Sequence, residues 1–572
     1  MQRIVVIGGV AAGPSAAAKA RRCAEKADIK LFERGPNISY AGCALPYYVS
    51  GIVKDRRKML VVTPEEFRAR HNVDLRVQHE AVAVDPAARQ VTVRDLVQGK
   101  EEVFPYDALI LATGASPFVP PIPGAKLPNI FTLRTVPDAD RIREMIATKE
   151  PKHAVVVGAG LIGLEMVEAL EERGIQVALV ELFEHVLPPL DADMAYLVEK
   201  KLRKKGVRVV TGDAVTEFVG DEQGVRVVRT RNGLELAAEL VIMSVGVRPN
   251  VELAVQAGVA LGANGTIAVN ERMETNVPGI YAAGDCAESY NIITGEKVWS
   301  PLGSVANKQG RTAGANAAGG EARFGGVTGS LISRIWDLSL GCTGLSEREA
   351  RQRGLDVEVI HVHPTNLAGV FPGAQALAVK VIADRRSGRL LGGQVVGGIG
   401  TDKRLDVMAT ALKGQLTVDE LFDIDYAYAP PFSPAKDPVA VAGIVTSNVL
   451  KGDVHSITAS ELWEWIKRGD DLVLLDVRTP KEYQHERIAD AVNVELDALR
   501  ERIGELDAGK NTVVYCRQGL RGFLAARILQ QCGFEQVSNL SGGMLSWPYQ
   551  VEKGPVSDQK AAQVGERGEP AP

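Results

Sequence analysis

The chain has 572 residues, of which 45% are hydrophobic and 24% are charged, close to the averages for globular proteins. At about 150 residues per domain, this length predicts roughly four domains. The 66 Lys and Arg residues against 71 Asp and Glu residues leave a net charge of −5, which argues against a basic surface for nucleic acid or membrane. No apolar run approaches the roughly 18 residues of a spanning helix, and the first residues resemble a buried strand, not a signal peptide. We therefore expect a cytoplasmic protein that binds neither nucleic acid nor membrane.

The cysteines are too few and too scattered for a disulfide scaffold, and none forms a C-x-x-C pair. They are Cys23, Cys43, Cys286, Cys342, Cys516 and Cys532. This pattern predicts reduced thiols and no metal site.

Strand-like runs alternate with helical patterns over residues 1–320, which is typical of α/β units around parallel sheets. A G-x-G-x-x-G motif follows the strand at residues 155–157 and consists of Gly158, Gly160 and Gly163. These glycines allow a tight turn, a close approach of pyrophosphate and helix–strand packing. Glu181 ends the next strand, where it can accept ribose hydroxyls and would repel a 2′-phosphate. The unit therefore predicts an NADH site, with NADPH bound more weakly.

A similar unit opens the chain but departs from the motif, because Val10 occupies the second glycine position. Gly8 and Gly13 remain, and Glu33 again ends the second strand. A tight turn without a ligand is the alternative interpretation. Two further strands that end in Gly turns favour a nucleotide instead; their turn residues are Thr113, Gly114, Gly284 and Asp285.

Together these segments resemble the flavoprotein disulfide reductases with two dinucleotide-binding domains. The resemblance implies FAD held by the first unit and the two further turns, with Asp285 at the ribityl–pyrophosphate part. It also implies FAD contacts from Glu33 and Arg34, and an NAD domain inserted between the two halves of the FAD domain.

Cys43 lies ten positions after Glu33, in the segment 39–47. Family members with a C-x4-C dithiol place a second cysteine where this chain has Tyr48. A single redox cysteine must cycle through a mixed disulfide, persulfide or sulfenic acid, and it reacts as the thiolate, favoured by a helix N-terminus or an electron-poor flavin. The alternative is a buried structural cysteine.

The Cys43 segment, the turn at residues 8–13 and the segment 426–431 together resemble coenzyme A-disulfide reductase over residues 1–447. The resemblance implies a homodimer in which Tyr428 acts on the partner's flavin and cysteine. It also implies coenzyme A contacts by Ser15, Lys19, Arg22, Ser39 and Lys436. Basic residues one helical turn apart suit phosphates, and a solvated basic face is the alternative.

Three positions depart from these relatives. Gly42 replaces a common Asn, and Phe371 replaces a Tyr that precedes a Pro-Gly pair. His363 begins a His-Pro-Thr segment like that of the dithiol reductases, but Ala368 stands where their Glu would be. These departures leave Tyr428 as the proton donor and leave the exact substrate open.

Residues 457–550 resemble a single-domain rhodanese, through the segment 474–478, the pair Glu482-Tyr483, the Cys516 loop and the segment 541–547. The loop from Cys516 to Arg521 has six residues, which suits sulfur better than phosphate. Its amides can cradle an anion and hold a persulfide on Cys516. The residues predicted to assist are Arg517, Gly519 and Arg521. An inert rhodanese-like module is the alternative.

The sequence thus predicts an α/β protein with two Rossmann-like domains for FAD and NAD, an α+β dimerisation domain and a C-terminal α/β rhodanese domain. The expected limits are 1–112 with 247–320 (FAD), 113–246 (NAD), 321–447 (dimerisation), 448–456 (linker), 457–552 (rhodanese) and 553–572 (disordered tail).

The favoured function is NADH- and FAD-dependent reduction of coenzyme A disulfide, coenzyme A persulfide or polysulfide at Cys43, with sulfane sulfur handled by Cys516. The products would be thiol and hydrogen sulfide. Two alternatives remain: an NADH oxidase or peroxidase that uses a sulfenic acid, and a sulfur-carrier or redox-signalling protein with slow turnover.

Overall fold

The computed structural model describes residues 1–262 and 264–554. They form two compact units, the first made of residues 1–188 and 202–329, the second of residues 189–201 and those from 330 onward. Of the tail predicted to be disordered, residues 555–572 lie outside the described residues.

The first unit contains two five-stranded parallel sheets. One has the order β18 (Ile280–Ala282), β7 (Ala108–Leu111), β1 (Arg3–Ile7), β2 (Asp28–Glu33), β3 (Asp74–Val77). The other has the order β12 (Arg208–Val210), β11 (Gln176–Val180), β10 (His153–Val157), β16 (Leu240–Met243), β9 (Ile130–Phe131). The apolar runs of β1 and β10 are buried, as in parallel sheets covered on both faces. The two predicted Rossmann-like domains are confirmed.

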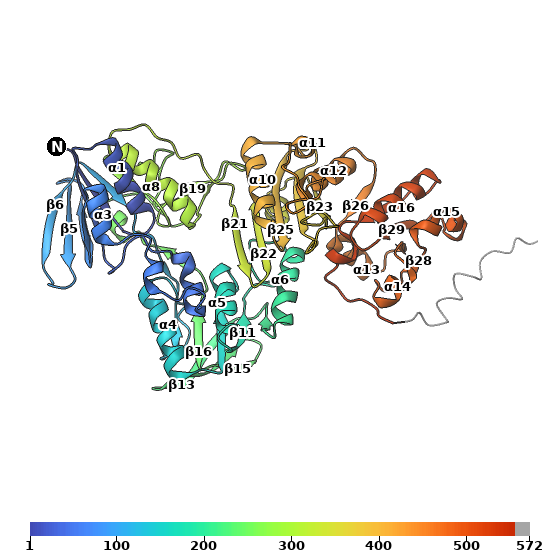
Figure 1. Cartoon of the computed structure of the whole chain (residues 1–572), viewed down its shortest axis with the longest axis horizontal. Helices are drawn as coiled ribbons and strands as arrows, with labels where there is room; N and C mark the ends of the chain where they lie inside the picture. Colours follow the sequence, from blue (N-terminus) through green and yellow to red (C-terminus); the bar gives the residue numbers. More distant parts are fainter. Residues whose placement is uncertain (263, 555–572) are drawn as a thin grey trace, which may run out of the picture. The chain divides into compact units, whose positions relative to one another are not determined.

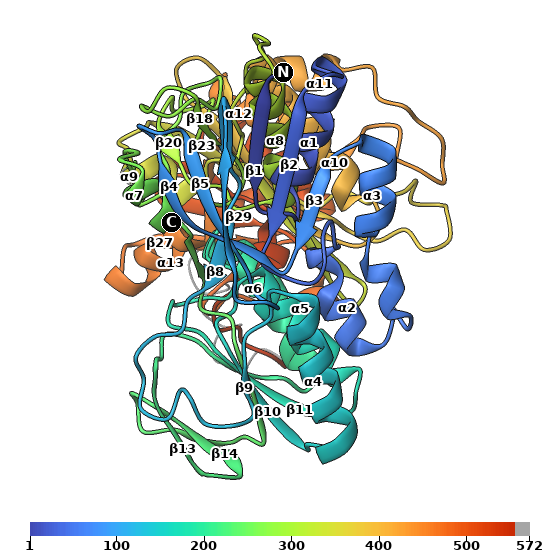
Figure 2. The same ribbon diagram turned by 90° about the vertical axis from the view of Figure 1, so that its left-hand side faces the viewer.

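Two helices rich in small residues, α1 (Ala12–Cys23) and α8 (Gly303–Ala317), pack closely in this unit. A Cβ atom on Gly310 would lie 2.2 Å from the Ala12 carbonyl oxygen, and one on Gly314 would lie 2.1 Å from that of Ala16. Only glycine allows this contact, which fixes the helix that begins at the first glycine turn. Figure 2 shows α1 and α8 next to β1 and β2.

The remaining elements of this unit form small antiparallel sheets and helices. The strands are β4 (His79–Asp85), β5 (Gln90–Asp95), β6 (Glu101–Pro105), β8 (Ala115–Pro117), β13 (Val215–Asp221), β14 (Gly224–Thr230), β15 (Glu235–Ala237), β17 (Val247–Pro249), β19 (Ser289–Tyr290) and β20 (Lys297–Val298). The helices are α2 (Leu45–Ser50), α3 (Pro64–His71), α4 (Val136–Lys149), α5 (Leu161–Glu171) and α7 (Glu252–Gln256).

The second unit begins with an antiparallel sheet in the order β21 (Leu331–Ile335), β22 (Leu338–Gly344), β25 (Leu390–Gly397), β24 (Ala378–Asp384), β23 (Val357–Val362). The helices of this part are α6 (Ala192–Lys204), whose first residues belong to this unit, α9 (Glu347–Gln352), α10 (Thr401–Gly414), α11 (Val418–Asp423) and α12 (Pro438–Leu450). Figure 1 shows α10 beside β22 and β25. This is the predicted α+β domain.

The C-terminal domain is a parallel sheet in the order β26 (His455–Ile457), β30 (Val537–Leu540), β29 (Asn511–Tyr515), β27 (Leu472–Asp476), β28 (Val492–Asn493). Its α-helices are α13 (Ala459–Arg468), α14 (Pro480–His485), α15 (Leu499–Arg502) and α16 (Leu520–Gln531). The predicted C-terminal α/β domain is confirmed.

The connection into this domain is shorter than the linker predicted over residues 448–456. Helix α12 continues to Leu450 and β26 begins at His455. The helix continues because the polar Ser447 donates a hydrogen bond to Asp419 (2.6 Å), and it stops before Gly452, which has φ +81°.

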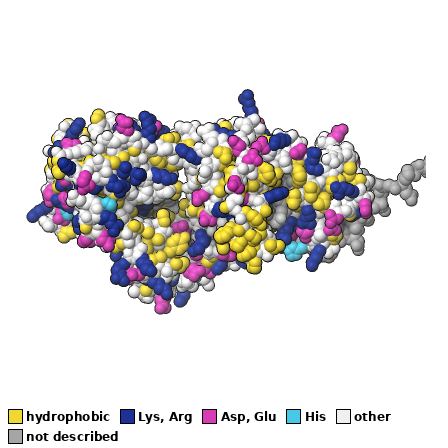
Figure 3. All heavy atoms as spheres, turned by 45° about the horizontal axis from the view of Figure 1, so that its top comes forward, with side chains coloured by type: hydrophobic (Ala, Val, Ile, Leu, Met, Phe, Trp, Pro, Cys, Tyr) yellow, Lys and Arg dark blue, Asp and Glu magenta, His cyan; other side chains and the backbone are white. Residues whose placement is uncertain are grey.

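No helix among residues 1–262 and 264–554 is long and apolar enough to cross a membrane. On the face drawn in Figure 3, Lys and Arg side chains are interspersed with Asp and Glu side chains.

Candidate active sites

The first glycine turn joins β1 to α1 and has no room for side chains. Gly8 has φ +105°, and a Cβ atom there would lie 2.1 Å from the carbonyl oxygen of Ala112, just beyond β7. A Cβ atom on Gly13 would lie 1.7 Å from the Gly8 carbonyl oxygen. The turn is therefore closed tightly against its neighbours, as a dinucleotide-binding turn requires.

Glu33, at the end of β2, is fixed beside this turn. Its carboxylate accepts hydrogen bonds from the backbone amides of Gly9 and Gly35, both at 2.6 Å. Two anchored oxygens retain further acceptor sites for ribose hydroxyls. The neighbouring Arg34 is exposed.

The two further turns lie at the same edge of the sheet, because β7 and β18 are parallel neighbours. Thr113 donates its hydroxyl to the backbone of Asn250 (2.6 Å), and Gly114 has φ +68°. Asp285 follows β18 and pairs with Arg134 at 2.7 Å. The sequence offered no signal for Arg134, which lies 151 positions away.

The second glycine turn repeats this design between β10 and α5. Gly158 has φ +97°, and a Cβ atom there would lie 2.3 Å from the Ser244 carbonyl oxygen. A Cβ atom on Gly163 would lie 2.0 Å from the Gly158 carbonyl oxygen, whereas Gly160 faces open space. That open side lies at the start of an eleven-residue helix, where the sequence predicts the approach of pyrophosphate.

Glu181 repeats the role of Glu33 in the second domain. It is buried, and its carboxylate accepts hydrogen bonds from the amides of Ala159 (2.6 Å) and Phe183 (3.0 Å). The residues present in both turns thus fit the two dinucleotides that the sequence implies.

Cys43 lies in a 3₁₀ turn, Gly42–Ala44, directly before α2. The residue reaches the surface, yet partial burial raises the pKa of its thiol, and the carboxylates of Glu165 and Asp285 raise it further against the opposing charge of Arg134. The groups of the chain itself therefore favour the protonated thiol. Sequence reasoning missed Glu165, which lies within the helix that follows the second glycine motif.

The residues next to Cys43 hold its segment in place. Ser39 has φ +42°, a left-handed conformation, and its amide donates to the Gly9 carbonyl (2.8 Å). Burial raises the pKa of Tyr40 to about 12. Tyr48, at the position of the missing second cysteine, is buried and donates to Asp140 (3.0 Å). All six cysteines lie among the described residues and are free.

The residues predicted to contact coenzyme A are placed in both units. Ser15, Lys19 and Arg22 share α1, and Ser15 donates to Asn307 of α8 at 2.6 Å. Arg22 is exposed. Asn307 has no distinguishing sequence signal and was missed.

Tyr428 and Lys436 lie in the segment before α12, and both are exposed. The segment is anchored by Asp437, whose carboxylate pairs with the buried Arg404 and accepts the Ser433 hydroxyl, both at 3.0 Å. Exposure of Tyr428 on an anchored segment leaves its hydroxyl available to another molecule.

Cys516 follows β29 directly and is 2% exposed. The amide of Gly519, which has φ +105°, donates to the Cys516 sulfur at 3.1 Å. The amides of Met544 and Leu545 hold the carbonyls of Cys516 (2.9 Å) and Arg517 (3.1 Å). The segment 541–547 therefore forms the floor of the cysteine loop.

The two arginines of this loop differ in their surroundings. Arg517 is exposed. Arg521 forms two bonds to Glu482, at 2.8 and 2.9 Å, and this pairing lowers the pKa of Glu482 to about 2. Sequence reasoning predicted the arginines and used Glu482 as part of the rhodanese resemblance, but it did not predict that Glu482 pairs with Arg521.

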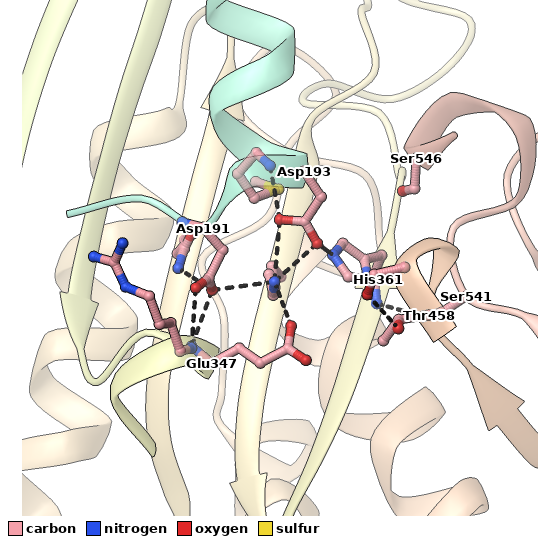
Figure 4. A network of polar contacts seen from close by, with 12 residues as sticks. Asp191, Asp193, Glu347, His361, Thr458, Ser541 and Ser546 are labelled. Carbon is pink, nitrogen blue, oxygen red and sulfur yellow. Dashed lines mark hydrogen bonds and ion pairs between the residues drawn. The ribbon is translucent and has the colours of Figure 1, made fainter. Parts of the chain in front are cut away.

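The segment 541–547, which lies under the Cys516 loop, also contacts β23 of the antiparallel domain (Figure 4). The amide of His361 donates to the Ser541 hydroxyl at 2.7 Å, and the His361 ring bonds Asp193 at 2.7 Å. Beneath it, the fully buried Lys380 pairs with Asp193 (2.8 Å), Glu347 (2.8 Å) and Asp191 (3.1 Å). The Cys516 loop thus rests on a segment held by the neighbouring domain.

The sequence around His363 resembles that of a catalytic base, but in the fold its ring is buried and hydrogen-bonded to another segment of the chain. Its ring nitrogen Nε2 is hydrogen-bonded to the Ser546 hydroxyl at 2.8 Å, and burial lowers its pKa to about 3. The unfolded chain takes up this proton near pH 6.5, so unfolding is favoured progressively as the pH falls from about 6.5 towards 3. The slope is up to about 1.4 kcal/mol per pH unit.

We expect His363→Gln, which can keep a hydrogen bond to Ser546, to lose less thermal stability than the unmodified protein between pH 7.5 and pH 5. The unfolding midpoint of both proteins at the two pH values measures this. His485→Gln, at an exposed position, is the control and should follow the unmodified protein. Equal losses in all three proteins would show that His363 does not control the acid response.

Comparison with protein families assigns each domain. Residues 2–314 match the pyridine nucleotide-disulphide oxidoreductase family, residues 334–439 match its dimerisation domain, and residues 458–549 match the rhodanese-like domain. The chain belongs to the pyridine nucleotide-disulphide oxidoreductase family and carries a C-terminal rhodanese-like domain. It is therefore an FAD- and NAD(P)H-dependent oxidoreductase.

Individual relatives narrow the comparison. An NADH oxidase of Methanocaldococcus jannaschii is 38% identical over 77% of this chain and 97% of its own length. An NAD(P)H coenzyme A polysulfide/persulfide reductase of Pyrococcus horikoshii is 39% identical, over 79% of this chain and 98% of its own.

Two solved structures extend over the C-terminal domain as well. Reduced CoADR-RHD of Bacillus anthracis is 40% identical with a TM-score of 0.92, covering 96% of this chain and 97% of its own. An NAD-dependent persulfide reductase from A. fulgidus is 39% identical with a TM-score of 0.89, covering 96% of this chain and 100% of its own.

Proposed function

We propose that the protein reduces coenzyme A persulfide, coenzyme A disulfide or polysulfide with NADH through Cys43, and that Cys516 handles the sulfane sulfur. The observation that carries this proposal is the exposed thiol of Cys43, which has no partner cysteine and lies within electrostatic reach of Asp285, in one chain with a complete Cys516 loop. The names of the two full-length structural neighbours support it. The domain limits expected from the sequence are part of this proposal.

The overall reaction for the persulfide is CoA–S–SH + NADH + H⁺ → CoA–SH + H₂S + NAD⁺. The Cys43 thiolate attacks the sulfur attached to coenzyme A, which forms a Cys43–S–S–CoA mixed disulfide and releases HS⁻. Two electrons then cleave this disulfide and restore Cys43. Bound FAD supplies the route for these electrons from NADH.

Cys43 must lose a proton before it attacks, because burial and the carboxylates of Glu165 and Asp285 raise its pKa. Tyr428 of the partner subunit is the proposed proton carrier in a homodimer. Its 54% exposure supports a role outside its own subunit.

The phosphates of coenzyme A are assigned to basic side chains of α1 and of the segment before α12. Arg22 is exposed on α1, and Lys436 is exposed close to Tyr428 in sequence. Ser15, Lys19 and Ser39 complete the proposed set. Charge-assisted hydrogen bonds from such groups suit a ligand with several phosphates.

NADH should be preferred over NADPH by at least about tenfold in kcat/KM, or roughly 1.4 kcal/mol. A 2′-phosphate would approach the buried Glu181 carboxylate, and residues 182–189 contain no Arg or Lys to offset the repulsion. Steady-state kinetics with both cofactors measure the preference. Equal specificity constants would refute the assignment of Glu181.

Mass spectrometry of the purified protein tests the substrate. A coenzyme A adduct should appear on Cys43 after incubation with coenzyme A disulfide and disappear after NADH is added. Two other candidate functions predict different results. An NADH oxidase, favoured by the name of the relative from M. jannaschii, should form a sulfenic acid on Cys43 instead of the adduct. A slow sulfur carrier should keep its adduct after NADH is added.

A further inference from the structure

The positive charge around Cys516 is smaller than the two loop arginines indicate. Both terminal nitrogens of the Arg521 guanidinium bind the two carboxylate oxygens of Glu482, at 2.8 and 2.9 Å. Such a bidentate pair leaves Arg521 with no net charge to offer an anionic ligand. Arg517 is then the loop arginine that can attract one.

Glu482 cannot easily swing away, because it also caps the helix on which it lies. It is the third residue of α14, where its carboxylate accepts the Thr479 amide at 3.1 Å while its own amide donates to the Thr479 hydroxyl at 3.3 Å. Such a reciprocal pair satisfies two backbone donors at the start of the helix. The negative charge beside Arg521 is therefore a built feature of the site.

The start of α16, next to the loop, is apolar instead. Leu520, within the six-residue loop, is 69% exposed, and Leu524, one turn later on α16, is 45% exposed. A sulfur donor with carbon atoms next to the sulfur gains from contact with Leu520. Thiosulfate, a small dianion, does not.

We propose that Glu482 is a specificity-determining residue: by cancelling Arg521 beside an apolar Leu520, it selects organic persulfides over thiosulfate as donors to Cys516. This inference rests on the proposed function, and it specifies the class of sulfur donor that Cys516 accepts. The step is Cys516–S⁻ + R–S–SH → Cys516–S–S⁻ + R–SH. The outer sulfur moves, and the leaving thiolate takes the proton. Coenzyme A persulfide fits, because a long uncharged arm separates its phosphates from its sulfur.

Glu482→Gln tests this, because glutamine keeps the helix cap and removes the charge. Sulfur transfer to cyanide is measured in the full-length protein without NADH, with thiosulfate and with coenzyme A persulfide as donors. We expect kcat/KM for thiosulfate to rise about tenfold and that for the persulfide to change less than about twofold. Glu482→Gln combined with Arg521→Met should return thiosulfate transfer to its original level.

Glu505→Gln is the matched control, since it breaks the exposed pair with Arg502 (2.7 Å) in the same domain, and it should change neither donor. Leu520→Ser should raise KM for the persulfide several-fold and leave thiosulfate unaffected. An unchanged thiosulfate-to-persulfide ratio in Glu482→Gln would overturn the inference. NADH-dependent reduction at Cys43 is measured separately, so failure of the proposed function is distinguishable from failure of this assignment.

Discussion

Replacing Cys43 by Ser should lower NADH-dependent reduction of coenzyme A persulfide and disulfide at least about 1,000-fold, while FAD stays bound and is still reduced by NADH. The hydroxyl cannot form the mixed disulfide on which the proposed reaction depends. The residues assigned to FAD and NADH lie in the two glycine turns, at the ends of the strands that follow them and in the turns after β7 and β18, and the substitution changes none of them. Rapid mixing with NADH reports flavin reduction, and NADH consumption reports turnover.

Cys532→Ser is the control for this experiment, because Cys532 is exposed in the C-terminal domain and lies outside both proposed sites. It should behave as the unmodified protein. Substantial turnover in Cys43→Ser would mean that Cys43 is structural and that another group receives the electrons.

Replacing Cys516 by Ser should separate the two activities of the chain. Sulfur transfer from persulfide or thiosulfate to cyanide should vanish, since Cys516 is the cysteine whose sulfur accepts a loop amide, from Gly519 at 3.1 Å. Reduction of coenzyme A persulfide should continue within about twofold, because that substrate reaches Cys43 directly. Reduction of protein-bound or polymeric sulfur should fall, because that sulfur must pass from Cys516 to Cys43.

NADH consumption with each kind of substrate, together with the cyanide assay, measures these effects. The short connection between Leu450 and His455 and the Ser541 contact with His361 (2.7 Å) favour transfer of sulfur by a diffusing thiol over a swinging domain. If every activity survives in Cys516→Ser, the C-terminal domain takes no part in the reaction.

The structural elements that the sequence predicts correctly depend on neighbouring residues. A strand, a glycine turn and a helix are consecutive, so Gly8, Gly13 and Gly158 identify their turns from local spacing alone. Glu33 and Glu181 follow from the length of the helix between two parallel strands. The same holds for Cys516, which directly follows a strand and begins a loop.

The missed parts depend on residues that only the fold brings together. Arg134 reaches Asp285 across 151 positions, and Glu482 reaches Arg521 across 39. Lys380 is buried among three carboxylates from two segments, and its own sequence neighbours are apolar strand residues. Opposite charges far apart in a sequence have too many possible partners for the pattern to select one.

The central claim is that NADH electrons reach sulfur–sulfur bonds through Cys43. The most direct test is anaerobic NADH oxidation with coenzyme A persulfide, with hydrogen sulfide measured in the same sample and oxygen alone as the comparison. We predict one hydrogen sulfide per NADH oxidised and a rate at least about ten times that with oxygen. NADH oxidation that requires oxygen and releases no hydrogen sulfide would contradict the account.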